Sequence, residues 1–240
     1  MLSLEPRAAI NPAGAIAGQY VDTSGVFHGF LRSPDGAITP FDIPGAGTGV
    51  GQGSFVTFGA GITPTGAIAG GIADANCTFH SAVRAKDGSF TLYDVPGAGT
   101  GPSQGTDEAG INPAVTSTGF YIDASNVFRG YVRANDGTLT LFDISDAGTG
   151  PFQGTEPLGI NLPGDIVGAY VDENGVNHGF VRAKSGAITK FEAPGAGTAS
   201  GEGTIPVLNN PADVIIGYYV DAEGVYHGFL RTAPGDTEQE

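Results

Sequence analysis

The 240-residue chain contains no tryptophan, one cysteine and one methionine, and it has only ten lysine and arginine residues against 25 aspartate and glutamate residues. Nucleic acids and anionic membrane surfaces are bound through clustered cations, so a net charge of −15 argues against both as partners. Cys77 cannot form a disulfide within the chain because it has no second cysteine to pair with. No apolar run approaches the length of a membrane-spanning helix.

Glycine, by contrast, is abundant, and one stretch of sequence recurs five times. Each copy begins with an aspartate and ends with an arginine. The aspartates are Asp22, Asp74, Asp123, Asp172 and Asp221, and the arginines are Arg32, Arg84, Arg133, Arg182 and Arg231. Successive copies are 52, 49, 49 and 49 residues apart. A constant period near fifty residues indicates a repeat architecture, so we expect these residues to build the repeat rather than to perform chemistry once.

Each repeat contains four short apolar runs bounded by turn residues. In the fourth copy they are residues 155–161, 165–172, 176–182 and 187–192. The runs are rich in β-branched and aromatic residues, and no window shows a helical stripe of apolar residues. We therefore predict four antiparallel strands in each repeat, which we call strands A to D.

Two turns set the predicted register. The loop between strands B and C has three residues and ends in a left-handed position, which Cys77 occupies in the second copy where other copies have glycine or asparagine. Between strands C and D, pairs such as Asp35-Gly36 predict two-residue hairpins. The first loop places Gly18 beside Phe30 and the second places Phe30 beside Phe41. We therefore expect these three residues to form a row on one face.

A four-stranded antiparallel sheet is a β-propeller blade, and radial repetition of such sheets gives a propeller. The predicted fold is all-β, a five-bladed β-propeller of four-stranded antiparallel blades, with an open β-solenoid-like repeat array as the alternative. The single domain 1–240 divides into repeats at about 4–53, 54–105, 106–154, 155–203 and 204–240. The first link between repeats is three residues longer than the others, in Ser54–Ala60, and Glu240 stands where other repeats place an aromatic residue.

A longer pattern, Gly-Ile-Asn-Pro-x-Gly-x-Ile-x-Gly-x-Tyr-x-Asp and then His-Gly-Phe, covers residues 10–30, 111–131, 160–180 and 208–229 with some departures. It resembles bacterial extracellular repeat proteins with a His-Ala-Phe core, and this resemblance implies secretion more than any activity. The second copy departs from the pattern at Ser81-Ala82 and the third at Arg129-Gly130. In period and strand count the chain also resembles five-bladed lectin propellers of the tachylectin type.

The five repeated aspartates are the first candidates for binding. On a propeller the B–C turns and the D–A links share one face, where a ring of carboxylates could bind Ca²⁺ or sugar hydroxyls. The alternative that we favour is that each aspartate caps its own turn by accepting backbone hydrogen bonds. For the repeated arginines we expect contacts to carboxylates or carbonyl groups of a neighbouring blade, with a basic ring for an anionic ligand as the alternative.

The histidines are not predicted to bind a metal, and no cofactor is expected. They are His28, His80, His178 and His227. They lie in different repeats and share their position with Arg129, which is not a metal ligand. We expect each histidine to pack against the tyrosine or isoleucine across the strand pair. Candidate glycosylation sites are Asn76, in the pattern Asn-Cys-Thr, and the link threonines Thr48, Thr100, Thr149 and Thr198.

No catalytic residue is predicted. A glycoside hydrolase is the strongest enzymatic alternative, because such enzymes occur on five-bladed propellers and need two converging carboxylates. The non-repeated acids form no recognisable motif. They are Asp107, Glu108, Asp146, Asp165, Glu173 and Glu223.

We therefore expect a non-catalytic structural or binding propeller at a bacterial surface, with a lectin-like glycan binder as the alternative. Self-association is expected through the edge of the last repeat, Val225 to Glu240, because a truncated outer strand leaves its neighbour partly open. Residues 1–10 lack the layout of a secretory signal. If the protein is exported, we expect this numbering to start at a mature or excised domain.

Overall fold

The computed structural model describes residues 8–57 and 61–232, which form nineteen β-strands. Blade one contains β1 (Ala8–Ile10), β2 (Ile16–Val21), β3 (Phe27–Arg32) and β4 (Ile38–Phe41). Blade two contains β5 (Gly53–Val56), β6 (Ile68–Ala73), β7 (Phe79–Arg84) and β8 (Phe90–Tyr93). Blade three contains β9 (Gly105–Ile111), β10 (Ser117–Ile122), β11 (Phe128–Arg133) and β12 (Leu139–Phe142).

Blade four contains β13 (Gly154–Ile160), β14 (Ile166–Val171), β15 (Asn177–Arg182) and β16 (Ile188–Phe191). Blade five contains, in its described part, β17 (Gly203–Asn209), β18 (Ile215–Val220) and β19 (Tyr226–Arg231). The described ranges contain no helix that could span a membrane. The structure is therefore all-β, as the strand signals predicted.

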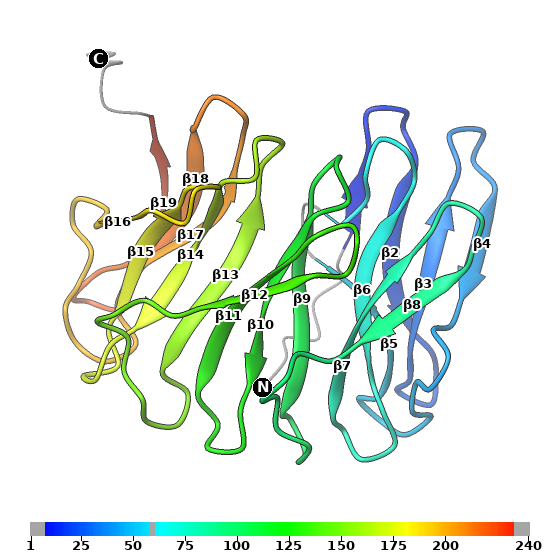
Figure 1. The fold of residues 1–240 in the computed structure, drawn as a ribbon, viewed down its shortest axis with the longest axis horizontal. Helices are drawn as coiled ribbons and strands as arrows, with labels where there is room; N and C mark the ends of the chain where they lie inside the picture. Colours follow the sequence, from blue (N-terminus) through cyan, green and yellow to red (C-terminus); the bar gives the residue numbers. More distant parts are fainter. Residues whose placement is uncertain (1–7, 58–60, 233–240) are drawn as a thin grey trace.

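Strands within a blade pair antiparallel with their sequence neighbours. Adjacent blades are joined by one parallel pair, in which the third strand of a blade meets the first strand of the next, for example Phe27 with Gly53 and Asn177 with Gly203. The fold is a five-bladed β-propeller with an open ring. Over residues 8–57 and 61–232, no strand pairing joins blade five to blade one. The blades stand in a row, with blade one at one end and blade five at the other (Figure 1).

The predicted register of the B–C hairpins is confirmed, and that of the C–D hairpins is wrong by one residue. Gly18 lies opposite Phe30 as expected, but Phe41 lies opposite Gly29. The C–D loop has three residues rather than two, because the Ser33 N–H donates to the Ala37 carbonyl at 2.9 Å across it. Its last residue, Gly36, has φ 93°, so a glycine closes the turn in the left-handed region.

This shift places Phe41 on the opposite face of the blade from Phe30, so the expected row does not form. The Phe41 ring passes over Gly29, where a side chain would collide with it. It also packs against blade two, with Phe90 at a ring-centroid distance of 5.9 Å. The aromatic residue of strand D therefore joins two blades.

Four of the five arginines that end strand C also contact the preceding blade, but through its aromatic rings. Arg133 lies 4.6 Å from the Tyr93 ring centroid, Arg182 4.8 Å from Phe142 and Arg231 4.5 Å from Phe191. Arg84 lies over Phe41 in the same way, at 5.2 Å. Each is a cation–π contact with the preceding blade, and the expected bridges to carboxylates or carbonyls of that blade are not what hold these guanidinium groups.

Apolar faces of successive blades pack together to form the core. Ala17 of blade one packs with Ile62 and Ile68 of blade two, and equivalent clusters fill later junctions. The residues predicted as a long link contain β5, the first strand of blade two. The three additional residues fall between Val56 and Gly61, and Phe58–Ala60 lie outside the described residues. Glu240 lies outside them as well.

Candidate functional site: the rim of turns and links

The B–C turns and the links between blades lie together on one rim, as predicted. The Gly47 N–H of the first link donates to the Ala73 carbonyl at the end of β6, at 2.9 Å. Gln52 of the same link accepts a hydrogen bond from the Gly49 N–H at 2.7 Å and donates to the Ala75 carbonyl in the next turn at 3.0 Å. Gln104 and Gln153 repeat this arrangement. Each link is thereby fixed to the turn of the following blade.

The five predicted aspartates are the caps of these turns. Asp22 accepts hydrogen bonds from the Ser24 N–H at 2.8 Å and the Val26 N–H at 2.9 Å. The other four make the same pair of bonds. The bond from Val26 is the largest influence that lowers the pKa of Asp22. The capping role is confirmed, and Cys77, at φ 61°, adopts the expected left-handed conformation. A binding role for these carboxylates stays a prediction.

The histidines pack as expected, and three of them also contact two carboxylates. Tyr20 stacks on His28 at a centroid distance of 5.1 Å. His28 Nδ1 lies 2.8 Å from Asp42 and its Nε2 lies 3.5 Å from Asp22. The hydrogen bond to Asp42 is the main reason why the pKa of His28 is raised. The equivalent carboxylates contact the other two, Asp74 and Asp94 at His80 and Asp172 and Glu192 at His178. In blade three Arg129 replaces histidine and bridges Asp123 and Asp143 as a permanent cation.

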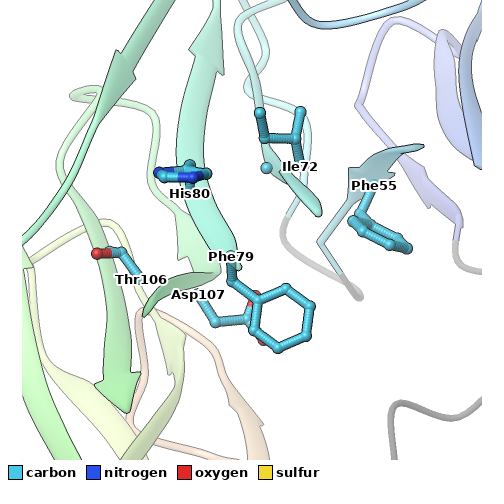
Figure 2. A pocket seen from close by; sticks show the side chains of 7 residues that line it. Phe55, Ile72, Phe79, His80, Thr106 and Asp107 are labelled. Atoms are coloured by element: carbon cyan, nitrogen blue, oxygen red, sulfur yellow. The ribbon is translucent and has the colours of Figure 1, made fainter. Parts of the chain in front are cut away.

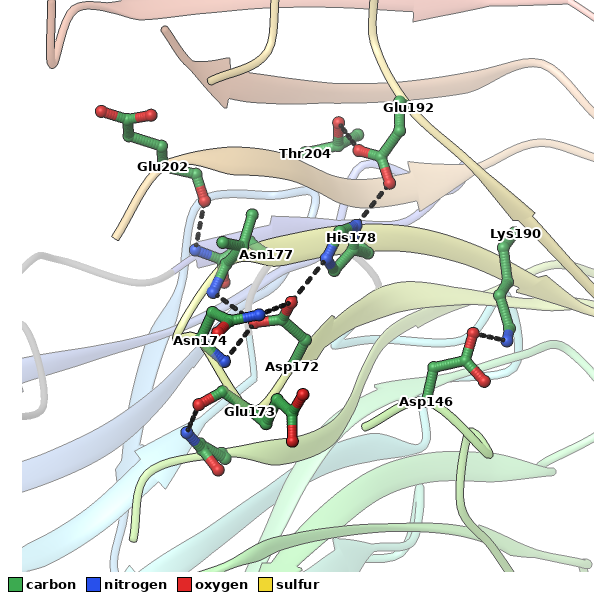
Figure 3. A network of polar contacts seen from close by, with 12 residues as sticks. Asp146, Asp172, Glu173, Asn174, Asn177, His178, Lys190, Glu192, Glu202 and Thr204 are labelled. Atoms are coloured by element: carbon green, nitrogen blue, oxygen red, sulfur yellow. Dashed lines mark hydrogen bonds and ion pairs between the residues drawn. The ribbon is translucent and has the colours of Figure 1, made fainter. Parts of the chain in front are cut away.

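A hollow of about 560 Å³ opens on this rim between the link into blade four and the turn of that blade. Figure 3 shows His178 between Asp172 and Glu192, and Lys190 paired with Asp146. The polar residues that line the hollow are Ser145, Asp146, Thr149, Tyr170, Asp172, Glu173, Asn174 and His178. The hollow therefore offers hydroxyl, amide and carboxylate groups to a ligand, and two of the predicted candidates, Asp172 and Thr149, lie in it together.

A second hollow of about 440 Å³ lies on the other side of the same turn. Glu173 and Asn174 line both hollows, and Ser200 lines only the second. Its apolar wall is Phe152, whose side chain is 66% exposed. Phe152 also has φ 63°, a backbone conformation in which a bulky residue is strained. Sequence reasoning missed this residue, although Gly51 and Gly201 occupy its position in other links and mark a left-handed site.

A much smaller void lies at the seam between blades two and three. The void there measures about 10 Å³, enough for a water molecule and too small for an organic ligand. Phe55, Phe79, His80 and Asp107 are among the residues around it (Figure 2).

A buried polar cluster at the same seam is the largest departure from the repeat. Glu108 accepts a hydrogen bond from the Tyr93 hydroxyl, and Tyr131 lies between this pair and Ser81. At the position of Glu108, blades four and five have Pro157 and Pro206, and blade two has Val56. Burial raises the pKa of Glu108 to about 8 and that of Tyr131 well above its usual value. Coincident polar replacements at Ser81, Tyr93, Glu108, Ser117 and Tyr131 were the sequence signal that could have revealed this cluster.

The remaining acids occupy separate places. Asp165 accepts a hydrogen bond from the Lys184 N–H at 2.9 Å, and Asp146 pairs with Lys190 at 2.5 Å. In the described ranges no group of three or more His, Cys, Asp or Glu side chains is arranged to hold a metal ion. The predicted glycosylation residues Asn76, Thr48, Thr100, Thr149 and Thr198 are exposed on the rim, and their modification stays a prediction.

No protein-family model matches the chain, and no curated protein sequence matches it. Among solved structures, the chain is similar to the BP39L lectin from Burkholderia pseudomallei, with a TM-score of 0.56 and 12% identity over 97% of this chain and 68% of that one. This similarity supports the propeller fold. A mutant of AofleA from Arthrobotrys oligospora matches with a TM-score of 0.44 at 12% identity, over 95% of this chain and 70% of that one. A puromycin hydrolase mutant matches with a TM-score of 0.38 at 13% identity, over 96% and 46%.

Proposed function

We propose that this protein is a non-catalytic carbohydrate-binding propeller that acts outside the cell or at its surface. The observation that carries the proposal is Phe152, an exposed aromatic ring held in a strained conformation beside polar side chains. Strain of this kind persists where the surrounding structure enforces it, and it concentrates at binding sites. The likeness of the fold to that of a lectin supports the same function.

The rim has the chemistry that a neutral sugar needs. The apolar face of a pyranose ring packs on an exposed aromatic ring such as Phe152, and its hydroxyls pair with amide and carboxylate groups such as Asn174 and Glu173. Asp146, Asp172 and Glu173 lie close to the turn, so an anionic sugar would meet like charges. The expected ligands are therefore neutral or amino sugars.

The principal glycan site is then at the turn of blade four. The aspartate caps recur in every blade, but an aromatic ring at the left-handed link position occurs only at Phe152, where the other described links have Gly51, Ser103 and Gly201. One strong site per chain is therefore expected, rather than the several equivalent sites that the repeat alone suggests.

The test is a glycan array with the intact chain, followed by calorimetric titration of a neutral glycan that binds. Phe152→Gly should weaken binding at least about tenfold through loss of the aromatic platform. The same change should raise the free energy of unfolding by about 1 kcal/mol because it relieves backbone strain. Ser103→Gly is the matched control, since Ser103 has φ 61° in the preceding link and should gain stability without any change in glycan binding. Absence of binding to every neutral glycan, or full affinity in Phe152→Gly, would contradict the proposal.

A structural subunit that assembles with other copies is the second candidate, and a different observation favours it. Both end blades leave apolar faces exposed. The sequence placed self-association at the edge Val225 to Glu240, of which residues 233–240 lie outside the described part of the chain. Within that edge Val225, Tyr226 and Leu230 are exposed. These residues support self-association through the face of blade five.

A further inference from the structure

One face of blade five is apolar and uncovered. The residues that share it alternate along β18 and β19, where Ile216 lies opposite Leu230 and Tyr218 lies opposite Gly228. Leu230 is 66% exposed and Ile216 is 46% exposed, and Tyr226 at the end of the same face is 71% exposed. Four large apolar side chains on one strand pair form a larger patch than isolated surface residues do, and such patches mark interaction sites.

The same position is fully covered in every other blade. The counterparts of Ile216 are Ala17, Ala69, Thr118 and Val167, each 0% exposed. The next blade covers this face. On the same face of blade four the Pro206 ring of β17 lies close to Gly179, and on that of blade three the Pro157 ring of β13 lies close to Gly130. At Gly228, the counterpart of Gly130 and Gly179 in blade five, no described residue lies within 4 Å of where a Cβ would stand. Blade five thus presents a surface that the repeat elsewhere always fills.

Blade one exposes the complementary surface. Ile10 is 66% exposed, and Ile38 and Tyr20 are also exposed. The counterparts of Ile10 in blades two to four are buried, and they are Ile62, Ile111 and Ile160. In the junction between blades one and two, Ile62 packs with Ala17 of the preceding blade. The face of blade one that holds Ile10 is therefore the one that a preceding blade covers.

We propose that the face of blade five defined by Ile216, Tyr218, Tyr226 and Leu230 docks on the face of blade one, around Ile10, of a second copy of this chain. The contact continues the blade-to-blade junction that the chain already makes four times. Blades one and five stand at opposite ends of the long axis, so the two faces of one chain do not meet (Figure 1). This inference rests on the structural-subunit candidate and is independent of glycan binding.

The geometry of such a contact determines the assembly. The two surfaces differ, so the interface is heterologous and each copy keeps one face free after the first contact. The result is a ring if the rotation closes and an open filament if it does not. A net charge of −15 on each copy opposes association, so added salt should strengthen it by screening the repulsion.

Sedimentation velocity of the intact chain over a range of concentration, at low and moderate salt, tests the inference. The wild-type chain should form dimers and longer species as concentration rises, and more of them at moderate salt. Leu230→Glu and Ile10→Glu should each weaken association at least about tenfold, because either places a charge in an apolar interface. Leu162→Glu, at an exposed leucine on neither face, is the control and should associate as wild type.

Mixing the two defective variants gives the decisive result. Leu230→Glu keeps an intact face on blade one, and Ile10→Glu keeps an intact face on blade five. Each should be monomeric alone, and an equimolar mixture should form heterodimers and nothing longer. Circular dichroism would establish that both are folded. A wild-type chain that stays monomeric at all concentrations, or a mixture that stays monomeric while the wild type assembles, would overturn the inference. A glycan array that shows no binding would contradict the proposed function but not this inference.

Discussion

At the scale of single residues, Glu108 shows what happens when one repeat departs from the others. Its carboxyl is buried in the seam between blades two and three, where the Tyr93 and Tyr131 hydroxyls lie next to it. Ser117, Arg133 and Asp107 also influence it. Because burial raises the pKa to about 8, the folded protein holds a proton on Glu108 that the unfolded chain, with a pKa near 4.5, has released.

This difference predicts a pH-dependent stability. Between about pH 4.5 and 8 the folded state binds more protons than the unfolded state, so the free energy of unfolding falls as pH rises. Glu108→Gln should remove a slope of up to about 1.4 kcal/mol per pH unit, and the variant should gain most over wild type above pH 8. Thermal unfolding followed by circular dichroism from pH 5 to 9 measures it. Glu173→Gln, at an exposed turn residue, should leave the slope intact, and an unchanged slope in Glu108→Gln would refute the burial argument.

At the scale of the strands, one glycine position separates an interior blade from the last one. A Cβ on Gly179 of β15 would lie 3.0 Å from the Phe191 ring and 3.1 Å from the Pro206 ring of the next blade. A Cβ on Gly228 of β19, at the same place in the repeat, would meet no atom of the described chain within 4 Å. In blade four the space beside this position is therefore filled by Phe191 of the same blade and Pro206 of the following one, and no described residue fills it in blade five.

Alanine at these two positions should therefore have unequal effects. Gly179→Ala should lower the free energy of unfolding by about 1–3 kcal/mol, because the packed rings must move. Gly228→Ala should stay within about 0.5 kcal/mol of wild type in dilute, monomeric protein. Denaturant unfolding of both variants compares them directly. Equal costs at the two sites would mean that blade five is covered in solution.

At the scale of the molecule, an open row of blades has a distinct pattern of stability. In a linear repeat each unit is stabilised by its neighbours, so end units have one interface where inner units have two. Amide hydrogen exchange in dilute solution should show the fastest opening in β1–β4 and β17–β19 and the slowest in β9–β12, with a difference of at least about tenfold. Uniform protection along the chain would indicate a closed ring.

Much of this architecture was readable from the sequence, because the period and the turn residues are local signals. The B–C register followed from Gly or Asn in the last loop position. The C–D register was wrong because Asp35-Gly36 suits both two- and three-residue loops, and only the Ser33–Ala37 hydrogen bond distinguishes them. Because of that one-residue difference, Phe41 lies on the other face of its blade. The aromatic residue of strand D can therefore contact the arginine of the following blade, as Phe41 contacts Arg84.

The candidate site was predictable only in part. Asp172 and Thr149 share a hollow because the turns and links share a rim, which the propeller topology implies. Phe152 was not predictable, since its significance lies in a backbone angle and in its exposure. The uncovered end faces were also out of reach, because ring closure depends on the angle between blades, and no local pattern encodes that angle. In the sequence Leu230 resembles the apolar residues of strand C in the other blades, and no local signal indicates that blade five has no following blade to cover it.

The polar seam around Glu108 affects which blade faces can pair during folding. Near-identical repeats invite misassembly, because each blade face would accept the wrong partner during folding. Tyr93 of blade two and Glu108, Ser117 and Tyr131 of blade three form a contact that no other pair of blades can reproduce. If either half met an ordinary apolar face, it would leave a buried acid or hydroxyls without partners, at a cost of several kcal/mol. This polar seam therefore favours the pairing of blade two with blade three over any other pairing of their faces during folding.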